Sequence, residues 1–378
     1  SASPARGAAA PNTDAAAAKG AADVGKDGRT PAYPGVRRGV PLEFPRDFGA
    51  HPEFRTEWWY ITGWLDMQAG TPFGFQITFF RSRPRIDPRN PSRFAAHQLV
   101  LAHLALSDDT RRSLVHDQRS ARAGFDLAGA RVGDTDVWID DWRLVRTGNA
   151  RASRYQAVLA GNRLALELEL VATQPLLLHG EAGYSRKGVR PEQASYYYTE
   201  PHLAVTGKVV HEARAHAVKG SAWLDHEWSS EILAADAVGW DWIGINLDDG
   251  GTLMAFRIRN RDGATVWAGG TRRAPDGTLQ VFDPRAIVFT PLREWRSART
   301  GARYPVAMRI TFDPDLTAAG ATRAETIELL PLFDDQELDA RIGTGIVYWE
   351  GAVTASREGR RVGRGYLELT GYHGAVSV

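Results

Sequence analysis

The sequence predicts an all-β protein built from two successive β domains. Three observations support this fold class: short apolar runs with the two-residue period of a strand, turn dipeptides between those runs, and one internal repeat. After residue 33, no segment keeps a helical hydrophobic stripe for three turns. A chain with many strands and no long helix must close its sheets or stack them, because open sheet edges pair with other chains.

The clearest strand is Leu164–Val171, whose four leucines occupy alternate positions and therefore share one face. Other apolar runs of strand length occur at Leu99–Leu106, Val137–Trp142, His202–Val210, Ala286–Thr290, Val306–Phe312, Thr326–Leu330, Ile346–Val353 and Tyr366–Thr370. Dipeptides typical of tight turns, such as Asp262-Gly263 and Asp276-Gly277, separate some of them.

The internal repeat concerns two tryptophan-rich segments. Trp240–Asp248 repeats the pattern of Trp58–Asp66. Each copy continues through a glycine turn into an apolar strand that ends in arginine, Phe75–Arg81 in the first and Leu253–Arg257 in the second. Self-similarity over this distance indicates two copies of one domain rather than a short-repeat solenoid.

We expect three regions along the chain. Residues 1–33 are Ala, Gly and Pro with scattered charges, which predicts a disordered low-complexity tail. The two β domains then occupy residues 34–229 and 230–378. The sequence begins at Ser1, which is compatible with a removed signal peptide. We therefore expect an exported protein, periplasmic or secreted, with a membrane tether at the removed end as a further option.

Composition excludes several classes of function. The 46 basic and 45 acidic residues give a net charge of +1, which argues against a nucleic-acid binder. The absence of cysteine excludes disulfides, iron–sulfur clusters and thiolate zinc sites. No phosphate-binding glycine loop or dinucleotide fingerprint is present, and we expect neither a cofactor nor a metal. No apolar run approaches the ~20 residues of a transmembrane helix.

The segment Ser221–Leu247 carries the most distinctive chemistry. If it forms a strand, alternation places His226 and Trp228 on one face and Asp225 and Glu227 on the other. Histidine transfers protons near neutral pH, and the face of a tryptophan holds a cation. A structural role is the alternative, with the acids paired to arginines and the tryptophans filling the core.

Seven longer motifs span nearly the whole chain after the tail: Phe44–Gly63, His179–Gly188, Tyr196–Tyr198, Ala222–Ser230, Gly239–Trp242, Tyr348–Gly351 and Gly365–Tyr372. Together they resemble the AttH / carotenoid 1,2-hydratase-like family, which includes a branch described as predicted secreted hydrolases. The resemblance implies two lipocalin-like β-barrels in tandem, export from the cytoplasm, and a genomic association with ABC-type transport systems.

The resemblance also implies site residues. The histidine and tryptophan that the hydratases use match His226 and Trp228. The tyrosine and aspartate that these enzymes use on the following strand have no counterpart in Gly251–Arg257, and Phe48 stands where the family often has histidine. The motifs therefore imply the fold more strongly than carotenoid hydration itself.

Hydration of an isolated alkene needs an acid kept protonated by a dry pocket, an aromatic face for the cation and a base for water. The candidate catalytic residues are His226, Trp228, Asp225 and Glu57. The candidate ligand contacts are His51, Trp58, Trp59, Tyr60, Glu227, Trp240 and Trp242. For Glu57, the alternative role is a salt bridge that closes a barrel. We expect His51, Glu57, Trp58, His226 and Trp228 to surround one cavity.

Three functions remain open from the sequence. The first is a lyase or isomerase that acts on a lipophilic, isoprenoid- or polyketide-like molecule. The second is a non-enzymatic carrier of a lipophilic ligand that works with an ABC-type transporter. The third is a hydrolase, for which the sequence shows no nucleophile motif.

Overall fold

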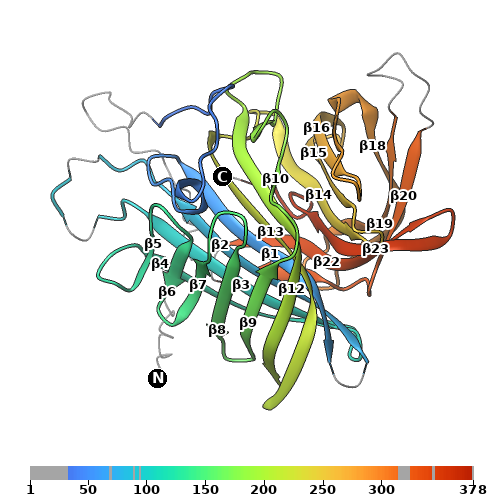
Figure 1. Ribbon diagram of the computed structural model, residues 1–378, viewed down its shortest axis with the longest axis horizontal. Coiled ribbons are helices and arrows are strands. Elements are labelled where there is room, and N and C mark those ends of the chain that lie inside the picture. The colour runs from blue at the N-terminus through green and yellow to red at the C-terminus, as the bar shows by residue number, and fades with distance from the viewer. Residues whose placement is uncertain are drawn as a thin grey trace, which may run out of the picture.

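The computed structural model describes residues 33–67, 70–87, 90–92, 95–313, 324–342 and 345–376. The predicted disordered tail lies outside the described residues, except for Tyr33. Within the described residues, the only helical elements are two 3-10 turns, η1 (Arg46–Phe48) and η2 (Pro284–Ala286). The all-β prediction is confirmed, because every longer element is a strand of one of two large sheets (Figure 1).

The first sheet has the strand order β4-β3-β2-β1-β13-β12-β9-β8-β7-β6-β5, and β10 and β11 also pair with β12. Its strands are β1 (Thr56–Met67), β2 (Pro72–Ser82), β3 (Leu99–Asp108), β4 (Ser113–Arg122), β5 (Ala128–Ala130), β6 (Asp136–Ile139), β7 (Trp142–Thr147), β8 (Arg154–Ala160), β9 (Leu164–Ala172), β10 (Leu177–Leu178), β11 (Tyr184–Arg186), β12 (Ala194–His211) and β13 (Arg214–Glu231). The end strand β4 lies close to β5 and β6, so the sheet curls nearly into a barrel.

The second sheet has the strand order β17-β16-β15-β14-β23-β22-β20-β19-β18, and β21 also pairs with β22. Its strands are β14 (Ala237–Leu247), β15 (Thr252–Asn260), β16 (Thr265–Arg273), β17 (Leu279–Phe282), β18 (Ile287–Arg296), β19 (Arg303–Phe312), β20 (Glu325–Pro331), β21 (Glu337–Ala340), β22 (Ile346–Arg357) and β23 (Arg360–Leu369). The strand β18, at one end of this order, also contacts β16 near the opposite end, so the second sheet curls as well.

The two sheets share one topology. In each sheet, the first strand along the chain pairs antiparallel with the second and with the last: β1 with β2 and β13, and β14 with β15 and β23. The tryptophan motifs lie on these two first strands, which is the arrangement that the internal repeat predicts. The chain passes from one sheet to the other between Glu231 and Ala237. The stricter expectation that Trp58 superposes on Trp240 stays a prediction.

The alternating pattern of the sequence explains the first core. In β9, Leu164, Leu166, Leu168 and Leu170 are buried, as their spacing predicts. They join a core cluster that lines the inside of the first sheet, and a second cluster lines the inside of the second sheet. The run Val137–Trp142 was expected to be one strand. It is divided into β6 and β7 instead, because Asp140 turns the chain at a φ of 52°.

A third cluster joins the two sheets through their outer faces. It contains aromatic and apolar side chains from both: Tyr60, Trp64, Tyr197, Trp223, Trp242, Met254, Phe256, Ile258, Ala352 and Tyr366. Trp64 on β1 also donates its indole N–H to the carbonyl of Gly365 on β23, at 3.0 Å. The outer faces of β1, β13, β14 and β23 are therefore buried between the sheets rather than exposed to solvent.

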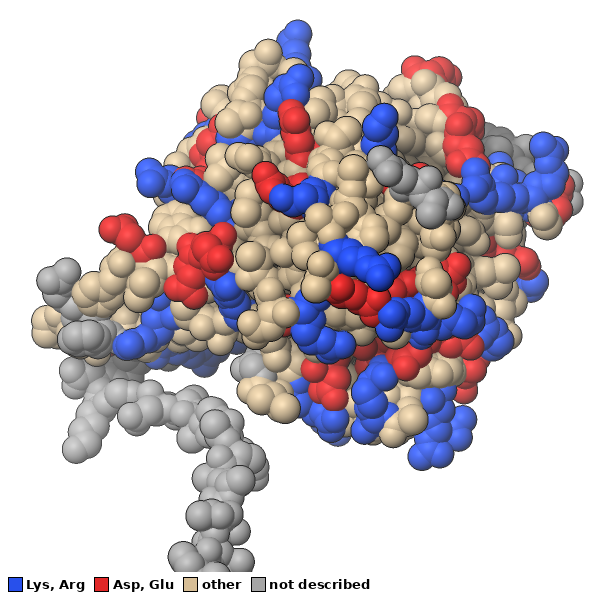
Figure 2. All heavy atoms as spheres, turned by 90° about the horizontal axis from the view of Figure 1, so that it is seen from below, with Lys and Arg blue, Asp and Glu red and all other residues tan. Residues whose placement is uncertain are grey.

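On the face of the molecule in Figure 2, basic and acidic side chains are interspersed rather than gathered into a patch of one sign. Many of them form exposed ion pairs, such as Arg309 with Glu328 and Arg299 with Asp335. Such pairs contribute little to stability, at most about 1 kcal/mol each. None of the helical turns in the described part of the chain has the length and apolarity of a membrane span.

Candidate functional site

Strand β13 carries the central motif and divides it between its two faces. His226 and Trp228 are fully buried and pack with the core inside the first sheet. Asp225 and Glu227 point to the other side and line a cavity between the two sheets. The alternation predicted from the sequence is confirmed. The two pairs of side chains consequently belong to two separate sites, one on each face of the strand.

Glu57 on β1 is the centre of the inner site. Its Oε1 accepts hydrogen bonds from His226 Nε2 and His51 Nδ1, both at 2.8 Å. Its Oε2 accepts from Arg81 Nε and from the backbone N–H of His51, both at 2.9 Å. Asp47 in η1 completes the network, with its Oδ1 at 3.2 Å from His51 Nε2. A carboxylate has about four accepting positions, so Glu57 is saturated.

The protonation states in this network follow from the contacts. Burial would raise the pKa of Glu57, but the hydrogen bonds from His226 and His51 hold that pKa well below its usual range. Burial would lower the pKa of His51, yet its bonds to Asp47 and Glu57 raise it to about 9. Burial lowers the pKa of His226, which is therefore neutral. Its Nε2–H donates to Glu57, so its Nδ1 accepts from the Tyr198 hydroxyl at 3.0 Å.

Aromatic rings enclose the two histidines. His51 stacks on Trp228 with ring centroids 3.7 Å apart and an interplanar angle of 6°. Trp59 lies against His226 with centroids 4.7 Å apart. The His226 side chain is 0 % exposed. The inner site is thus buried, and each of its titratable atoms has a hydrogen-bond partner, which is compatible with the structural alternative that the sequence left open.

The inner site also resembles a set of metal ligands, because donor atoms of His51, Glu57 and His226 lie within 4.8 Å of one another. The surroundings do not fit a cation. The guanidinium of Arg81 already neutralises the same carboxylate, and every donor atom of the three is engaged in a hydrogen bond. A metal ion would add a further positive charge beside Arg81 and the protonated His51, and would be repelled in this low-dielectric interior.

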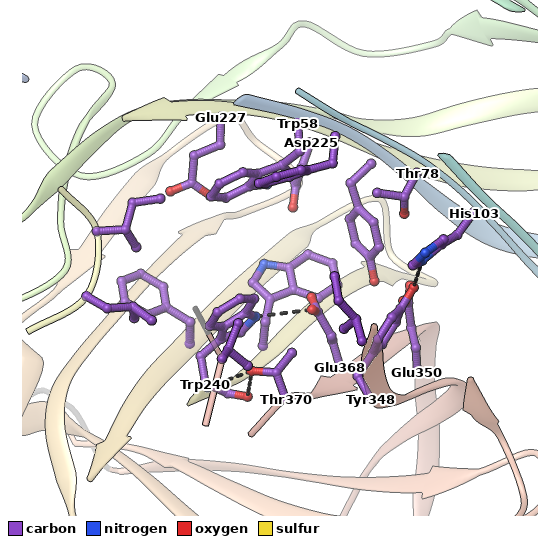
Figure 3. Close-up of a pocket in the computed structure, with 18 of the residues that line it drawn as sticks. Trp58, Thr78, His103, Asp225, Glu227, Trp240, Tyr348, Glu350, Glu368 and Thr370 are labelled. Carbon is purple, nitrogen blue, oxygen red and sulfur yellow. Dashed lines mark hydrogen bonds between the residues drawn. The ribbon is translucent and has the colours of Figure 1, made fainter. Parts of the chain in front are cut away.

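The outer site is a cavity of about 190 Å³ between the sheets (Figure 3). Aromatic and apolar side chains from both sheets line most of it: Trp58, Phe80, Leu101, Ile232, Leu233, Trp240, Trp242, Phe256, Ile258, Ile346 and Val376. Four carboxyl groups interrupt this lining: Asp225, Glu227, Glu350 and Glu368. Figure 3 shows the first two on one side of the cavity and the last two on the other.

Glu350 and Glu368 are cross-strand neighbours on β22 and β23. Burial raises the pKa of Glu350 well above its ordinary value, and the charge of Glu368 raises it further. Burial also raises the pKa of Glu368, against a hydrogen bond from Trp240 Nε1 at 3.2 Å. Glu350 Oε1 and the Tyr60 hydroxyl are buried and make no hydrogen bond to another described residue. At neutral pH, this pair therefore keeps at least one proton.

Asp225 faces the pair from the first sheet. It accepts hydrogen bonds from the Tyr197 hydroxyl and the Trp223 indole, both at 2.7 Å, and from the Thr199 hydroxyl. Burial raises the pKa of Asp225 to about 7 despite these bonds. A carboxyl group with this pKa is divided between acid and base near neutral pH, which suits it to proton transfer.

The neighbouring groups complete the polar side of the cavity. Lys187 Nζ lies 2.8 Å from Glu227 Oε1, and both side chains are almost fully buried. On the opposite side, the Tyr348 hydroxyl lies 2.7 Å from His103 Nδ1, and Gln76 Nε2 donates to the same hydroxyl at 3.1 Å. Burial lowers the pKa of His103 to about 4, so this histidine is neutral at physiological pH.

The expectation of a single cavity around His51, Glu57, Trp58, His226 and Trp228 is wrong, because Trp58 lines the outer cavity whereas the other four contact one another in the inner network. Alternation along β1 turns Trp58 and Tyr60 into the outer cavity, and Glu57 and Trp59 into the first barrel. The structure brings the candidates Asp225, Glu227, Trp58, Tyr60, Trp240 and Trp242 together in the outer cavity. It places His51, Glu57, Trp59, His226 and Trp228 in the inner network.

Sequence reasoning missed Glu350, Glu368, Lys187, His103 and Tyr348 as cavity residues. A signal existed for four of them: Lys187 lies in the motif His179–Gly188, Tyr348 and Glu350 in the motif Tyr348–Gly351, and Glu368 in the motif Gly365–Tyr372. None of these motifs by itself indicates which of its side chains faces a cavity. That fact depends on the docking of β22 and β23 against the first sheet.

Comparison with known proteins agrees with this architecture. The model of the AttH-like family matches residues 35–372. A crystal structure from Nitrosomonas europaea, assigned to AttH, is 51% identical in sequence with a TM-score of 0.81, and the match covers 90% of this chain and 99% of that one. Comparison with curated protein sequences gives no significant match.

Two more distant structures share the fold. Kievitone hydratase from Nectria haematococca is 14% identical, with a TM-score of 0.64 over 90% of this chain and 95% of that chain. CghA in complex with Sch210972 is 13% identical, with a TM-score of 0.55 over 91% of this chain and 96% of that chain. At such low identity these similarities concern the fold. The family match and the Nitrosomonas structure together show that the chain belongs to the AttH-like family.

Proposed function

We propose that the cavity between the sheets is the active site of a hydro-lyase that adds water to, or removes it from, a carbon–carbon double bond of a lipophilic molecule. The observation that carries the proposal is the buried pair Glu350 and Glu368, which faces Asp225 and Glu227 across an aromatic cavity (Figure 3). The fold similarity to a hydratase is compatible with this reaction.

The groups of the cavity divide between acid and base. In the hydration direction, Glu350 gives its proton to one alkene carbon, and the π electrons form the new C–H bond. The adjacent carbon becomes positive beside the faces of Trp240 and Trp242. Water attacks that carbon, and Asp225 as a carboxylate takes the proton that the water loses. Solvent then reprotonates Glu350 and deprotonates Asp225, which restores both groups.

Burial makes this assignment physically reasonable. An acid strong enough to protonate carbon, yet still protonated at neutral pH, needs the raised pKa that a dry site provides. A tertiary carbocation needs stabilisation without a nucleophile in contact, and the face of an indole supplies it. His226 does not take part, because it is enclosed in the first barrel on the other face of β13.

The size of the cavity limits the substrate. Sites for drug-sized ligands usually enclose ~300–1,000 Å³. A cavity of about 190 Å³ fits a smaller unsaturated molecule, or one end of a longer molecule that extends out of the mouth. The linker residues Ile232 and Leu233, together with Val376, add apolar surface to the cavity wall. A full-length carotenoid would not be enclosed.

The alternative is a carrier of a lipophilic ligand that works with an ABC-type transporter outside the cytoplasm. The largely apolar lining favours the carrier. The carboxyl groups argue against the carrier, because burial of each carboxyl costs desolvation free energy, and a carrier with apolar side chains at these positions would avoid that cost.

Deuterium exchange separates the enzyme from the carrier without a known substrate. The protein is incubated in D2O with a panel of neutral prenyl alkenes and the corresponding tertiary alcohols, and products are analysed by mass spectrometry. We expect one or more compounds to gain deuterium at the carbon next to the reacting centre. Glu350→Gln should reduce this incorporation by 100-fold or more, in line with the usual contribution of a general acid of about 10²–10⁴.

The matched control is Glu167→Gln, which removes an exposed carboxylate on β9 by the same chemical change. It should leave incorporation unchanged. If panel compounds bind to the cavity but none gains deuterium with the unmodified protein, the hydro-lyase proposal is wrong and the carrier is supported.

A further inference from the structure

The charges in the cavity wall are strongly asymmetric. Four of its lining residues are carboxylic acids, and among the described lining residues the only basic side chains are Lys187 and His103. His103 is neutral, because burial lowers its pKa to about 4. Ionisation of any of these acids therefore adds negative charge that no unpaired basic group of the lining balances.

Lys187 does not compensate for this asymmetry. Its ammonium group lies 2.8 Å from Glu227 Oε1 and is also in contact with the ring faces of Tyr197 and Phe256, at 4.7 and 4.0 Å from the ring centroids. Both partners of the ion pair are almost fully buried. Pulling Lys187 away to meet a bound anion would leave Glu227 charged and unpaired in a dry site, which is strongly unfavourable.

The unpaired polar atoms of the cavity point to a missing ligand group. Glu350 is 3 % exposed and Tyr60 is 6 % exposed. The two groups interact with each other, but neither Glu350 Oε1 nor the Tyr60 hydroxyl makes a hydrogen bond of standard geometry among the described residues. Buried polar atoms usually have a partner, so unsatisfied ones require an explanation. Trp240 and Trp242 line the same space with aromatic surface, which attracts positive charge.

We propose that this cavity binds small lipophilic ammonium ions in preference to uncharged molecules of the same shape, and that it excludes lipophilic carboxylates. The inference rests on the proposed function for its location, because the ammonium nitrogen would occupy the position of the positive carbon. The inference therefore defines the class of ligand. A natural substrate is uncharged or cationic and carries no carboxylate or phosphate. An ammonium ion finds carboxyl groups and indole faces there, whereas an anion finds only Lys187, which is already paired.

The proposal also fixes the direction of the pH dependence. Asp225 is faced by Tyr197 and Thr199 of β12, by Trp223 and Glu227 of its own strand, by Lys187 before β12, and by Glu368 of β23. A permanent cation favours the ionised carboxylate, so binding releases a proton when Asp225 is protonated. Because the pKa of Asp225 is about 7, affinity for the cation should fall as the pH decreases below 7, until only the pH-independent contact with the indole faces remains.

The test compares three probes on the full chain. Benzyltrimethylammonium is the cation, neopentylbenzene is its uncharged isostere with carbon in place of nitrogen, and 3-phenylpropanoate is the anion. Dissociation constants are measured by NMR titration at pH 8 and pH 5. We expect the cation to bind at least about tenfold more tightly than the isostere at pH 8, since a desolvated cation–π contact has that magnitude. We expect this advantage to become smaller at pH 5, where Asp225 is protonated. At pH 8, where 3-phenylpropanoate is fully ionised, we expect it not to bind.

Asp225→Asn removes the carboxylate that is ionised at pH 8, so it should reduce the affinity for the cation and leave that for neopentylbenzene within a factor of about two or three. At pH 8, equal affinity for cation and isostere, or binding of 3-phenylpropanoate in the cavity, overturns the inference. The outcome is independent of the exchange experiment. Cation preference without deuterium incorporation supports this inference and rejects the hydro-lyase, whereas incorporation without cation preference does the reverse.

Discussion

At the scale of single residues, His51 shows how a network can make a histidine cationic within a protein interior. It lies between the carboxylates of Asp47 and Glu57 and stacks on the face of Trp228. Its hydrogen bonds outweigh the cost of burial and raise its pKa to about 9. His226, which contacts the same Glu57 oxygen, is neutral because burial prevails there.

The raised pKa of His51 predicts a specific loss of stability at alkaline pH. In the unfolded chain a histidine has a pKa of about 6.5. The proton bound in the folded state therefore stabilises the protein fully below pH 6.5, and this stabilisation is lost as pH rises through about 9. The shift corresponds to about 3 kcal/mol. His51→Gln should remove this dependence.

Urea denaturation of both proteins at intervals from pH 6 to 10 measures the effect. The difference in unfolding free energy between the two should shrink by about 3 kcal/mol over the range from pH 6.5 to 9. Groups that titrate elsewhere cancel in that difference. His373→Gln changes an exposed histidine and should give a curve parallel to that of the unmodified protein. A constant difference between H51Q and the unmodified protein would show that His51 is neutral in the fold.

Individual residues also show where sequence reasoning succeeds. The alternation in β13 correctly assigns His226 and Trp228 to one face and Asp225 and Glu227 to the other, because side-chain direction in a strand is local. The sequence does not indicate which face adjoins a cavity. The resemblance to hydratases implied a role in catalysis for His226. The structure encloses this side chain inside the first sheet, where it is 0 % exposed.

At the scale of elements, the contact between β2 and the strands β22 and β23 depends on a missing side chain. A Cβ atom added to Gly74 would lie 2.5 Å from the Tyr366 hydroxyl and 2.6 Å from the Ala352 methyl group. Gly74 thus allows the backbones of the two sheets to approach closely beside the cavity. Neither Tyr366 nor Ala352 has room to withdraw, because both are buried in the cluster between the sheets.

Gly74→Ala should consequently destabilise the protein and disturb the cavity. Overpacking of this kind typically costs about 1–3 kcal/mol. The substitution should also weaken the binding of benzyltrimethylammonium, because Glu350 on β22 moves with Ala352. Gly35→Ala is the control, since nothing lies within 4 Å of the added methyl group there. Thermal denaturation and NMR titration measure both effects. An unaltered melting temperature for G74A would mean that the sheets are more loosely docked than the structure shows.

The elements also explain why the second half of the site could not be predicted. The strands β22 and β23 appear in the sequence as ordinary apolar runs, Ile346–Val353 and Tyr366–Thr370, in which one glutamate each interrupts the pattern. A single acid in a strand is usually solvent-exposed. Only the packing of the outer faces of both sheets against each other buries Glu350 and Glu368. Such contacts join residues that are far apart in the chain, and periodicity contains no information about them.

At the scale of the whole molecule, the two sheets are similar in topology and share a buried cluster. The internal repeat predicted two copies of one domain, and the strand order of both sheets agrees with that expectation. The repeat does not indicate how the copies are arranged. In the structure, they share a buried cluster that includes Trp64, Trp223 and Trp242. The apolar outer faces would be exposed to solvent in a separate barrel. Here they pack against each other and join the two sheets.

This arrangement predicts that the two sheets unfold together. Separation would expose an aromatic patch on each half, and burial of each large aromatic side chain contributes roughly 1.5–3 kcal/mol. Differential scanning calorimetry of the full chain should therefore show a single transition, with equal calorimetric and van't Hoff enthalpies.

Amide hydrogen exchange is the second measurement, because it follows both sheets in one experiment. Fluorescence of a variant that keeps only Trp295 is not suitable, because Trp228 and Trp349 fill the two cores and their replacement would disturb both. We expect the most protected amides of β9 and of β19 to exchange with the same free energy of opening. Two resolved calorimetric transitions, or a difference of several kcal/mol between these strands, would show that each sheet folds alone and that the cavity between them forms only afterwards.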